Sequence, residues 1–456
     1  MRPSATQPWQ PQPRCLPGSQ RHRWPTSLII YLLFTFLAIL HLAYLFGVAL
    51  PERFLAPHDE MFHGLPLSGD EGDYVHLGYN LARQGVFGYG EHAVLTARRP
   101  PLWPLVLAGL FRFTDNPVYL LICNHLLAAL AAVLAAILAS GLFSRRLSLL
   151  IMVVVGLNPN SYSFVRLYAE PLFTVLLLLV MIFWTRTRLS PRRRDPVCLG
   201  LAAGLLALTR AEGLILIVLL ALDLFYQARL DRPRTPALLC FLLAALLPLT
   251  PWLARNYTTM GFVGLVSNAG EVFAGAHNDK ILATDPGRWL HFDAFASPAQ
   301  LAQRQQLSEI EYNRQAWQLG WENLSRHPVL FLLTLEMKKL LITFSPYFVL
   351  LPPTYPPIFN TLTALPYSLL WLLFLILAGR WLILGEPWRV FLLPFLVPLL
   401  VTLIFYGIVR FRVPYEPLAL TLTVGCLADW LSTRWTARRP ATAPPKHSAS
   451  SPGIST

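Results

Sequence analysis

The sequence predicts an all-α polytopic membrane protein, and three observations lead to this fold class. Hydrophobic residues make up 55% of the 456 residues, and charged residues only 13%. Several apolar runs reach or approach the roughly 20 residues that a helix needs to cross a bilayer. Most arginines stand between these runs, as topology signals do. Because lipid offers no partner for backbone polar groups, spanning segments are expected to be helices. The alternating pattern of a membrane barrel is absent from the sequence.

Composition argues against two other classes of protein. The net charge of +13 could suggest nucleic-acid binding, but the arginines lie between apolar runs, where membrane topology explains them better. The five cysteines form no CxxC pair. Four of them fall in or beside apolar runs, so neither a disulfide framework nor a cysteine metal cluster is indicated.

The domain organisation is a single membrane domain between two tails. Residues 1–26 are rich in Pro, Gln and Arg, and are expected to be a disordered cytosolic tail. Residues 432–456 are first basic and then rich in Pro, Ser and Ala, and are expected to be a second disordered cytosolic tail. Residues 27–431 form the transmembrane domain, with long outer loops at 51–116 and 254–361.

Ten spans are expected, the first of them an uncleaved signal anchor, because its apolar core is longer than the roughly 7–15 residues of a signal peptide. They are residues 27–50, 117–143, 147–165, 171–185, 196–210, 212–227, 236–253, 362–380, 389–408 and 414–431.

Two further apolar segments are not expected to span. Residues 102–113 are too short and are interpreted as a re-entrant or interfacial helix. Residues 329–344 contain Glu336, Lys338 and Lys339, which suggests an amphipathic helix on the membrane surface.

The positive-inside rule supports this layout with both termini in the cytosol. Short inner segments such as 186–194 and 229–234 are then arginine-rich, whereas the long outer loops hold most of the acids. If residues 102–113 formed a full span, the following loops would invert and Arg192, Arg193 and Arg194 would lie outside.

The first outer loop contains an unusual acidic stretch, Ser68-Gly69-Asp70-Glu71-Gly72-Asp73-Tyr74. Residues 70–84 are predicted to form a short helix, because Ser68 or Asp70 can cap its start and Gly85 can end it. Acids in a first helical turn are often there for helix electrostatics alone. A carboxylate cluster at an apolar–polar boundary can also serve as a general base or a metal site.

Glu170 stands at the lip of a predicted span. Acids at membrane depth are rare and favour a functional role. The alternative is a pair with Arg166, four residues earlier on the same helix face. Arg210 and Glu212, between two tightly joined spans, are interpreted as a packing or loop pair, and His277 as a possible but weak metal ligand.

Several outer-face arginines could bind phosphate through two parallel hydrogen bonds, or could only anchor helix ends at lipid headgroups. They are Arg98, Arg99, Arg255, Arg410 and Arg412.

Six short motifs resemble, in this order, the lipid-linked-sugar glycosyltransferases of the GT-C fold. The nearest resemblance is to bacterial relatives of protein O-mannosyltransferases and of the aminoarabinose transferases that modify lipid A. The motifs are Asp70-Glu71-Gly72-Asp73-Tyr74, Arg99-Pro100-Pro101-Leu102-Trp103-Pro104-Leu105, Tyr168-Ala169-Glu170-Pro171-Leu172-Phe173, Thr209-Arg210-Ala211-Glu212-Gly213, Pro251-Trp252-Leu253-Ala254-Arg255-Asn256-Tyr257 and Arg410-Phe411-Arg412-Val413-Pro414-Tyr415-Glu416-Pro417.

The resemblance implies a polyprenyl-phosphate sugar as donor and a reaction at the outer leaflet. Asp70 would be the catalytic base, with Glu71 as the second candidate, and Glu170 would help to hold acceptor or metal. The residues expected to bind substrate are Asp73, Tyr74, Arg99, Arg255, Asn256, Arg410 and Arg412. Direct displacement would invert the anomeric centre, so the two-carboxylate pattern of hydrolases need not apply.

Two departures from the family pattern narrow the expectation. No second luminal domain is visible, so a protein acceptor has no support in the sequence. Arg99, and not an acid, precedes Pro100-Pro101, so a metal-ligand pair is not visible. A divalent cation, Mg²⁺ or Mn²⁺, is therefore left open.

The function predicted is transfer of one sugar from a polyprenyl-phosphate carrier to a lipid, glycan or protein acceptor at the periplasmic face of the inner membrane, without nucleic acid. The main alternative is a transporter or flippase, which would favour paired half-repeats and ionisable residues near mid-span. A structural subunit or an inactive relative is a third possibility.

Overall fold

A computed structural model describes most of the chain, and the described part is predominantly helical. Among the residues that the structure describes, six helices are long and apolar enough to cross a membrane. The predicted class, an all-α polytopic membrane protein, is confirmed. The described residues are 25–55, 58–67, 69–90, 93–163, 166–189, 192–230, 235–277, 306–346 and 357–437. Most of both expected tails lies outside them, but residues 25–26 and 432–437, predicted to be disordered, are helical.

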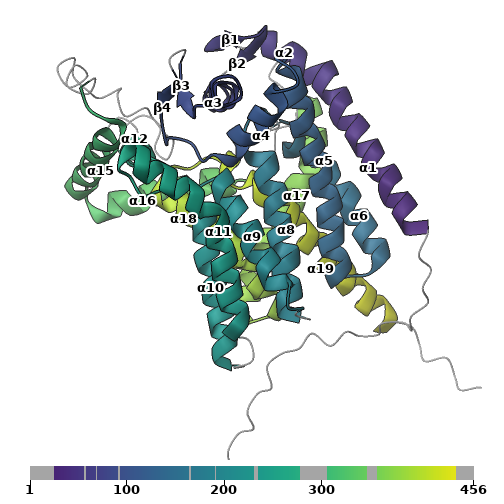
Figure 1. The fold of residues 1–456 in the computed structure, drawn as a ribbon. Helices are drawn as coiled ribbons and strands as arrows, with labels where there is room; N and C mark the ends of the chain where they lie inside the picture. Colours follow the sequence, from purple (N-terminus) through teal and green to yellow (C-terminus); the bar gives the residue numbers. More distant parts are fainter. Residues whose placement is uncertain are drawn as a thin grey trace, which may run out of the picture.

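Each of the ten predicted spans falls on a helical segment, and the longer helices run side by side as a bundle (Figure 1). The first helix, α1, continues through a π-helical turn, η1 (Leu45–Ala49), into α2 (Leu50–Leu55). The helices on the predicted spans are α1 (Pro25–Tyr44), α5 (Val118–Leu142), α6 (Arg145–Gly156), α8 (Glu170–Leu189), α9 (Asp195–Thr209), α10 (Gly213–Leu230), α11 (Thr235–Met260), α17 (Pro357–Ile383), α18 (Leu396–Ile404) and α19 (Glu416–Ala437).

Two predicted spans differ from the helices observed. Helix α6 ends at Gly156, and a separate short helix, α7 (Asn160–Ser163), follows. Pro159 accounts for the break, because the α conformation is disfavoured for the residue that precedes a proline. The span at 389–408 begins as a 3₁₀ helix, η4 (Pro387–Phe395), before α18. The prolines in η4 account for this geometry, because proline lacks the amide hydrogen that a regular α-helix needs.

Smaller elements cover one end of the bundle (Figure 1). We call it the outer end, because the sequence predicts that this end faces outward. They are α3 (Asp70–Gln84), α4 (Leu102–Phe111) and two antiparallel hairpins, β1 (Glu60–Phe62) with β2 (Leu65–Leu67) and β3 (Gly88–Tyr89) with β4 (Val94–Leu95). Helices α12 (Ala269–Ala276), α15 (Glu309–Arg326) and α16 (Val329–Phe344) project to one side at this end.

Helix α3 confirms the predicted helix at 70–84 but not its capping. Gly85 ends it in the left-handed conformation, with φ of 71°. Gly69 is the N-cap residue and makes no side-chain cap, and Asp70 is the first helical residue. Ser68 lies outside the described residues. The Asp70 carboxylate is therefore not a capping group and is available for other contacts.

Both segments predicted not to span form helices. Helix α4 is ten residues long and packs closely on α3: a Cβ added at Gly78 would lie 2.7 Å from the Leu107 Cβ. Helix α16 exposes an apolar stripe of residues four apart, while Lys339 on its other side is buried. The stripe consists of Val329, Leu333, Met337 and Leu341. This amphipathic pattern suits a membrane surface, which remains a prediction.

Candidate functional site

The site is centred on the Asp70 carboxylate at the start of α3. Arg410 Nη1 donates a hydrogen bond of 2.8 Å to Asp70 Oδ2, and the Arg99 guanidinium is hydrogen-bonded to Asp70 Oδ1. Arg99 also contacts Asp73 Oδ2, at 2.9 Å from Nε and 2.7 Å from Nη2. Arg99 therefore joins two acids of the first turn of α3.

Glu170 joins the same group of charges from another part of the chain. It is the first residue of α8, where Pro171 suits the first helical turn. Its side chain is 3% exposed, and its Oε1 atom accepts hydrogen bonds from both Arg210 and Arg410. Arg410 thus bridges Asp70 and Glu170, which are a hundred positions apart in the sequence.

Local structure explains how the two arginines reach Glu170. Helix α9 ends at Thr209, and Arg210 takes an extended conformation at the turn into α10. Arg410 lies on a single 3₁₀ turn, η5 (Val409–Phe411). The predicted pair of Arg210 with Glu212 is present, with 3.2 Å between Nε and Oε1.

The suggested pair of Glu170 with Arg166 is wrong. Arg166 precedes the start of α8, so the two residues do not share a helix face. Its guanidinium lies 3.9 Å from the Glu71 carboxylate instead.

Aromatic rings frame this cluster of charges. The Arg410 guanidinium lies 3.8 Å from the centre of the Tyr168 ring, and the Arg99 guanidinium 5.5 Å from that of Tyr74. Both distances are within the range of cation–π attraction. The Arg99 and Arg410 side chains are only 20% and 16% exposed, which strengthens their electrostatic interactions with the carboxylates.

The arginines dominate the electrostatics of Asp70. Burial would raise the pKa of the Asp70 carboxyl, but Arg99 and Arg410 outweigh that effect and hold the pKa well below its usual range. Burial raises the pKa of Tyr74 to about 12. At neutral pH the cluster therefore contains an ionised Asp70 and a neutral Tyr74.

Glu71 lies outside the cluster although it adjoins Asp70. Successive residues of a helix differ in direction by about 100°, and the Glu71 side chain is buried on another face of α3. There it is paired with Arg53 and accepts a 2.8 Å hydrogen bond from the Leu167 amide.

Arg412 also lies apart, in a second buried network. Its Nε donates to Glu416 Oε1 at 3.0 Å, and both side chains are fully buried. Asn158 and Asn160 each donate to the same carboxylate, at 2.9 and 2.8 Å.

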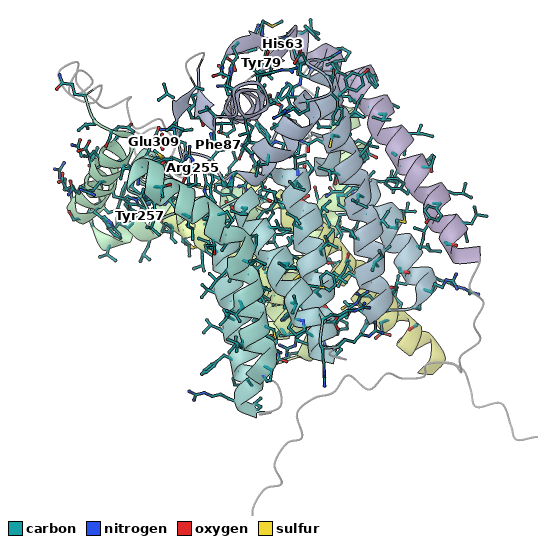
Figure 2. The ribbon with its side chains drawn as sticks, in the orientation of Figure 1. His63, Tyr79, Phe87, Arg255, Tyr257 and Glu309 are labelled. Carbon is teal, nitrogen blue, oxygen red and sulfur yellow. The ribbon has the colours of Figure 1, made fainter. Side chains whose placement is uncertain are left out.

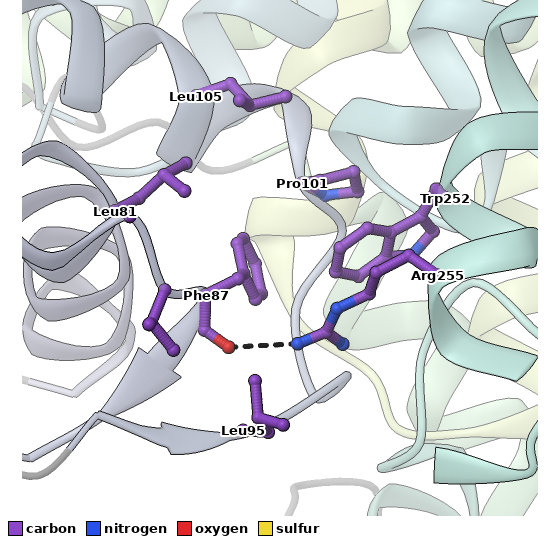
Figure 3. Close-up of a pocket in the computed structure, with 9 residues that line it drawn as sticks. Leu81, Phe87, Leu95, Pro101, Leu105, Trp252 and Arg255 are labelled. Atoms are coloured by element: carbon purple, nitrogen blue, oxygen red, sulfur yellow. Dashed lines mark hydrogen bonds between the residues drawn. The ribbon is translucent and has the colours of Figure 1, made fainter. Parts of the chain in front are cut away.

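Arg255 lines a cavity of about 310 Å³ at the outer end (Figure 3). Its guanidinium donates to the carbonyl oxygens of Thr96, at 2.7 Å, and Phe87, at 3.1 Å. The remaining lining is apolar: Leu81, Gly85, Val86, Phe87, Leu95, Pro101, Leu105 and Trp252. Asn256 donates to the Gly264 carbonyl at 2.8 Å and does not line the cavity.

The side helices are tied to the segment that carries Arg99. Arg98 pairs with Glu271 of α12 at 2.7 Å. Glu309, at the start of α15, accepts hydrogen bonds from the Thr96 hydroxyl at 2.7 Å and the Ala97 amide at 2.9 Å. Figure 2 places Glu309 close to Phe87 and Arg255.

The carboxylates as arranged do not fit a divalent cation. Both Asp70 oxygens and Glu170 Oε1 face guanidinium groups, which would have to leave first. Over the described part of the chain, no group of three or more His, Cys, Asp or Glu residues gathers. His277 Nε2 lies 2.7 Å from the Lys339 ammonium, an unsuitable neighbour for a metal.

Of the predicted site residues, the structure brings together Asp70, Asp73, Tyr74, Arg99, Glu170 and Arg410. It places Glu71, Arg255, Asn256 and Arg412 elsewhere. Arg210 and Tyr168 are the cluster residues that sequence reasoning did not single out for binding. The available signal was topology, because the predicted layout places both residues at turns on the outer side, beside spans.

Comparison with known proteins adds little. No protein-family model matches the chain, and no curated protein matches it significantly. Among solved structures, it is similar to ArnT from Cupriavidus metallidurans bound to undecaprenyl phosphate, with a TM-score of 0.38 and 14% identity over 91% of this chain and 81% of that one. At these values the similarity establishes neither a shared fold nor a shared function. The structure itself defines the class: a multi-pass, all-α membrane protein with a carboxylate–arginine cluster at one end.

Proposed function

We propose that the protein is a GT-C-like membrane glycosyltransferase that moves a sugar from a polyprenyl-phosphate carrier to an acceptor hydroxyl at the periplasmic face of the inner membrane. The observation that carries this proposal is the bridge from Asp70 through Arg410 to Glu170. It joins a candidate base and phosphate-binding groups at the outer end of the bundle. The ordered series of GT-C motifs supports the same conclusion.

In the proposed reaction, Asp70 acts as the general base. Its carboxylate takes the proton of the acceptor hydroxyl as that oxygen attacks the anomeric carbon. The bond from this carbon to the phosphate oxygen breaks, and polyprenyl phosphate leaves with the electron pair. One displacement of this kind inverts the anomeric centre.

Arg99 and Arg410 are the proposed phosphate ligands, since arginine binds phosphate through parallel charge-assisted hydrogen bonds. Both now contact Asp70, so an incoming phosphate would compete with it for guanidinium N–H groups. Losing these partners would move the Asp70 pKa back toward its ordinary value and make the carboxylate a stronger base. Donor binding would thereby activate the base.

The cavity beside Arg255 is the proposed site for the isoprenoid chain of the donor. Its lining is apolar except for Arg255, whose guanidinium already donates to two carbonyl oxygens. We therefore assign Arg255 to shaping the cavity and Arg99 and Arg410 to the phosphate. A bound divalent cation remains a prediction, and no step is assigned to it.

The experiment is a transfer assay on purified protein in proteoliposomes that contain native membrane lipids as acceptors. A panel of labelled polyprenyl-phosphate hexoses and pentoses serves as donor, and release of polyprenyl phosphate is measured. Asp70→Asn should reduce turnover by about 10²- to 10⁴-fold with a smaller effect on donor binding. Asp115→Asn, an exposed acid paired with Arg83 outside the cluster, is the matched control.

Two outcomes would overturn the proposal. One is equal turnover by wild type and Asp70→Asn. The other is movement of intact donor across the bilayer without release of polyprenyl phosphate, which would establish the transporter alternative.

A further inference from the structure

The site cluster and the buried Arg412 network meet at one small cavity. The cavity has a volume of about 30 Å³ and lies among α5, α7, α8 and the start of α19. Glu170 of the site cluster and Asn160 of the Arg412 network both line it.

Glu170 brings an unpaired acceptor to this cavity. Its Oε1 atom takes the hydrogen bonds from both Arg210 and Arg410. Its Oε2 atom is buried and has no hydrogen-bond partner. The residue as a whole is 2% exposed, so bulk water does not hydrate that oxygen.

Asn160 brings a second unpaired acceptor. Its Nδ2 donates to Glu416 Oε1 at 2.8 Å. That contact fixes the orientation of the amide, because the flipped amide would place its oxygen against a carboxylate. The Oδ1 atom of Asn160 is consequently left without a partner, in a residue that is 1% exposed.

The two residues that line this cavity thus each carry a buried acceptor without a partner, and a single donor with two hydrogens would satisfy both. The Thr174 hydroxyl, which also lines the cavity, already donates its hydrogen to the Glu170 carbonyl at 2.8 Å. A cation is disfavoured, because Glu170 already carries two guanidinium groups. The volume suits a water molecule, which needs at least roughly 10–15 Å³ measured in this way.

We propose that an ordered water bridges Glu170 Oε2 and Asn160 Oδ1, and that Asn160 is thereby a positioning residue for Glu170. The water fixes the plane of the Glu170 carboxylate so that Oε1 faces Arg210 and Arg410. The expected effect of this water on turnover rests on the proposed glycosyl transfer, whereas the presence of the water does not depend on that function.

The first test is a structure of the full-length protein at a resolution that shows ordered water. One density peak within hydrogen-bond distance of both Glu170 Oε2 and Asn160 Oδ1 is expected. A dry cavity would overturn the proposal. So would an anomalous peak there in crystals soaked with rubidium, which would identify a cation. This test holds even if glycosyl transfer is not the function.

The second test compares two asparagines that bind the same carboxylate. Asn158→Leu and Asn160→Leu each remove one donor to Glu416, but only Asn160 lines the cavity. Asn160→Leu should lower kcat/KM for the donor about tenfold further than Asn158→Leu, through a higher donor KM as well as a lower turnover number, because Glu170 orients Arg410 and Arg410 is the proposed phosphate ligand. Equal losses in the two variants would contradict the proposal.

A third variant separates positioning from general damage. Ala131 lines the cavity from α5, and Ala131→Val would fill it without removing a polar group. Ala131→Val should lower the turnover number, and the double variant should be no worse than Asn160→Leu alone, because both changes displace the same water. Additive losses would show two independent defects and overturn the bridge.

Discussion

At the scale of single residues, Arg410 determines how the site is assembled. It is the group that contacts both Asp70 and Glu170, and its guanidinium also lies over the Tyr168 ring. Two chain segments that are distant in sequence, one at Asp70 and one at Tyr168 and Glu170, thus converge on one planar cation. A guanidinium suits this place because it presents several donors in fixed directions, which an ammonium group does not.

Replacing Arg410 with lysine should preserve the charge but lose the bridge. We expect kcat/KM for the donor to fall about 10- to 100-fold, which corresponds to the loss of one or more hydrogen bonds to charged groups. The measurement is the transfer assay over a series of donor concentrations. Arg83→Lys, in a surface pair with Asp115, serves as control, and equal activity of wild type and Arg410→Lys would refute the role of the bridge.

Glu71 should be important for folding and dispensable for chemistry. Glu71→Gln leaves Arg53 buried without its counter-charge, which should cost about 3–5 kcal/mol of stability. The double variant Arg53→Met/Glu71→Gln removes both charges and keeps an oxygen for the Leu167 amide. It should recover most of the thermal stability and retain turnover. A double variant that folds like wild type but is inactive would return Glu71 to the list of catalytic residues.

The depressed pKa of Asp70 predicts a pH dependence of stability. Its ion pairs stabilise the folded protein fully above the unfolded-state pKa of about 3.9, and this contribution is lost as pH falls through the lower folded-state pKa. The difference in unfolding free energy between wild type and Asp70→Asn should therefore be constant from pH 8 to pH 5 and shrink below about pH 4. Chemical unfolding in detergent at each pH measures it, and a difference that grows with acid would contradict the assignment.

At the scale of elements, local patterns predicted most of the structure. Apolar run length located the helices of the bundle, and Gly85 located the end of α3. Pro159 could have predicted the break between α6 and α7, but the segment was interpreted as one span because of its apolar residues. The pairing of Glu170 with Arg210 was not predictable locally, because it depends on how α8 packs against the α9–α10 turn. Asp70 and Glu71 were the first and second candidates for the base, and the rotation along α3 places their side chains in different networks.

The packing of α9 on α11 depends on two glycines one helical turn apart. A Cβ added at Gly200 would lie 2.3 Å from the Phe241 carbonyl oxygen, and one at Gly204 would lie 2.4 Å from that of Ala245. Small residues at this spacing let membrane helices approach closely. Gly204→Ala should therefore lower the thermal midpoint, as overpacking costs about 1–3 kcal/mol.

The control for Gly204 is Gly141→Ala in α5, where nothing lies within 4 Å of an added Cβ. Alanine favours the helix over glycine by up to about 1 kcal/mol, so this variant should be as stable as wild type or more so. Thermal unfolding of both variants in the same detergent makes the comparison. Equal shifts in the two would show that the close α9–α11 contact is not required.

At the scale of the whole molecule, the end that carries the candidate site lies opposite the end that carries the arginine-rich segment after α8. The start of α1 and the end of α19 both point away from the end that carries α3 (Figure 1). The arginine-rich segment after α8 follows the other end of a helix whose first residue is Glu170. This agrees with the positive-inside prediction, in which the site faces outward.

Cysteine labelling tests that orientation directly. In a background with all five native cysteines replaced, Val94→Cys places a thiol on the exposed hairpin beside α3, and Arg193→Cys places one after α8. A membrane-impermeant maleimide added to sealed spheroplasts should label position 94 and leave position 193 unlabelled. Both should react after the membrane is permeabilised. The reverse pattern would place the Asp70–Glu170 site in the cytosol, where a donor displayed at the outer leaflet cannot reach it.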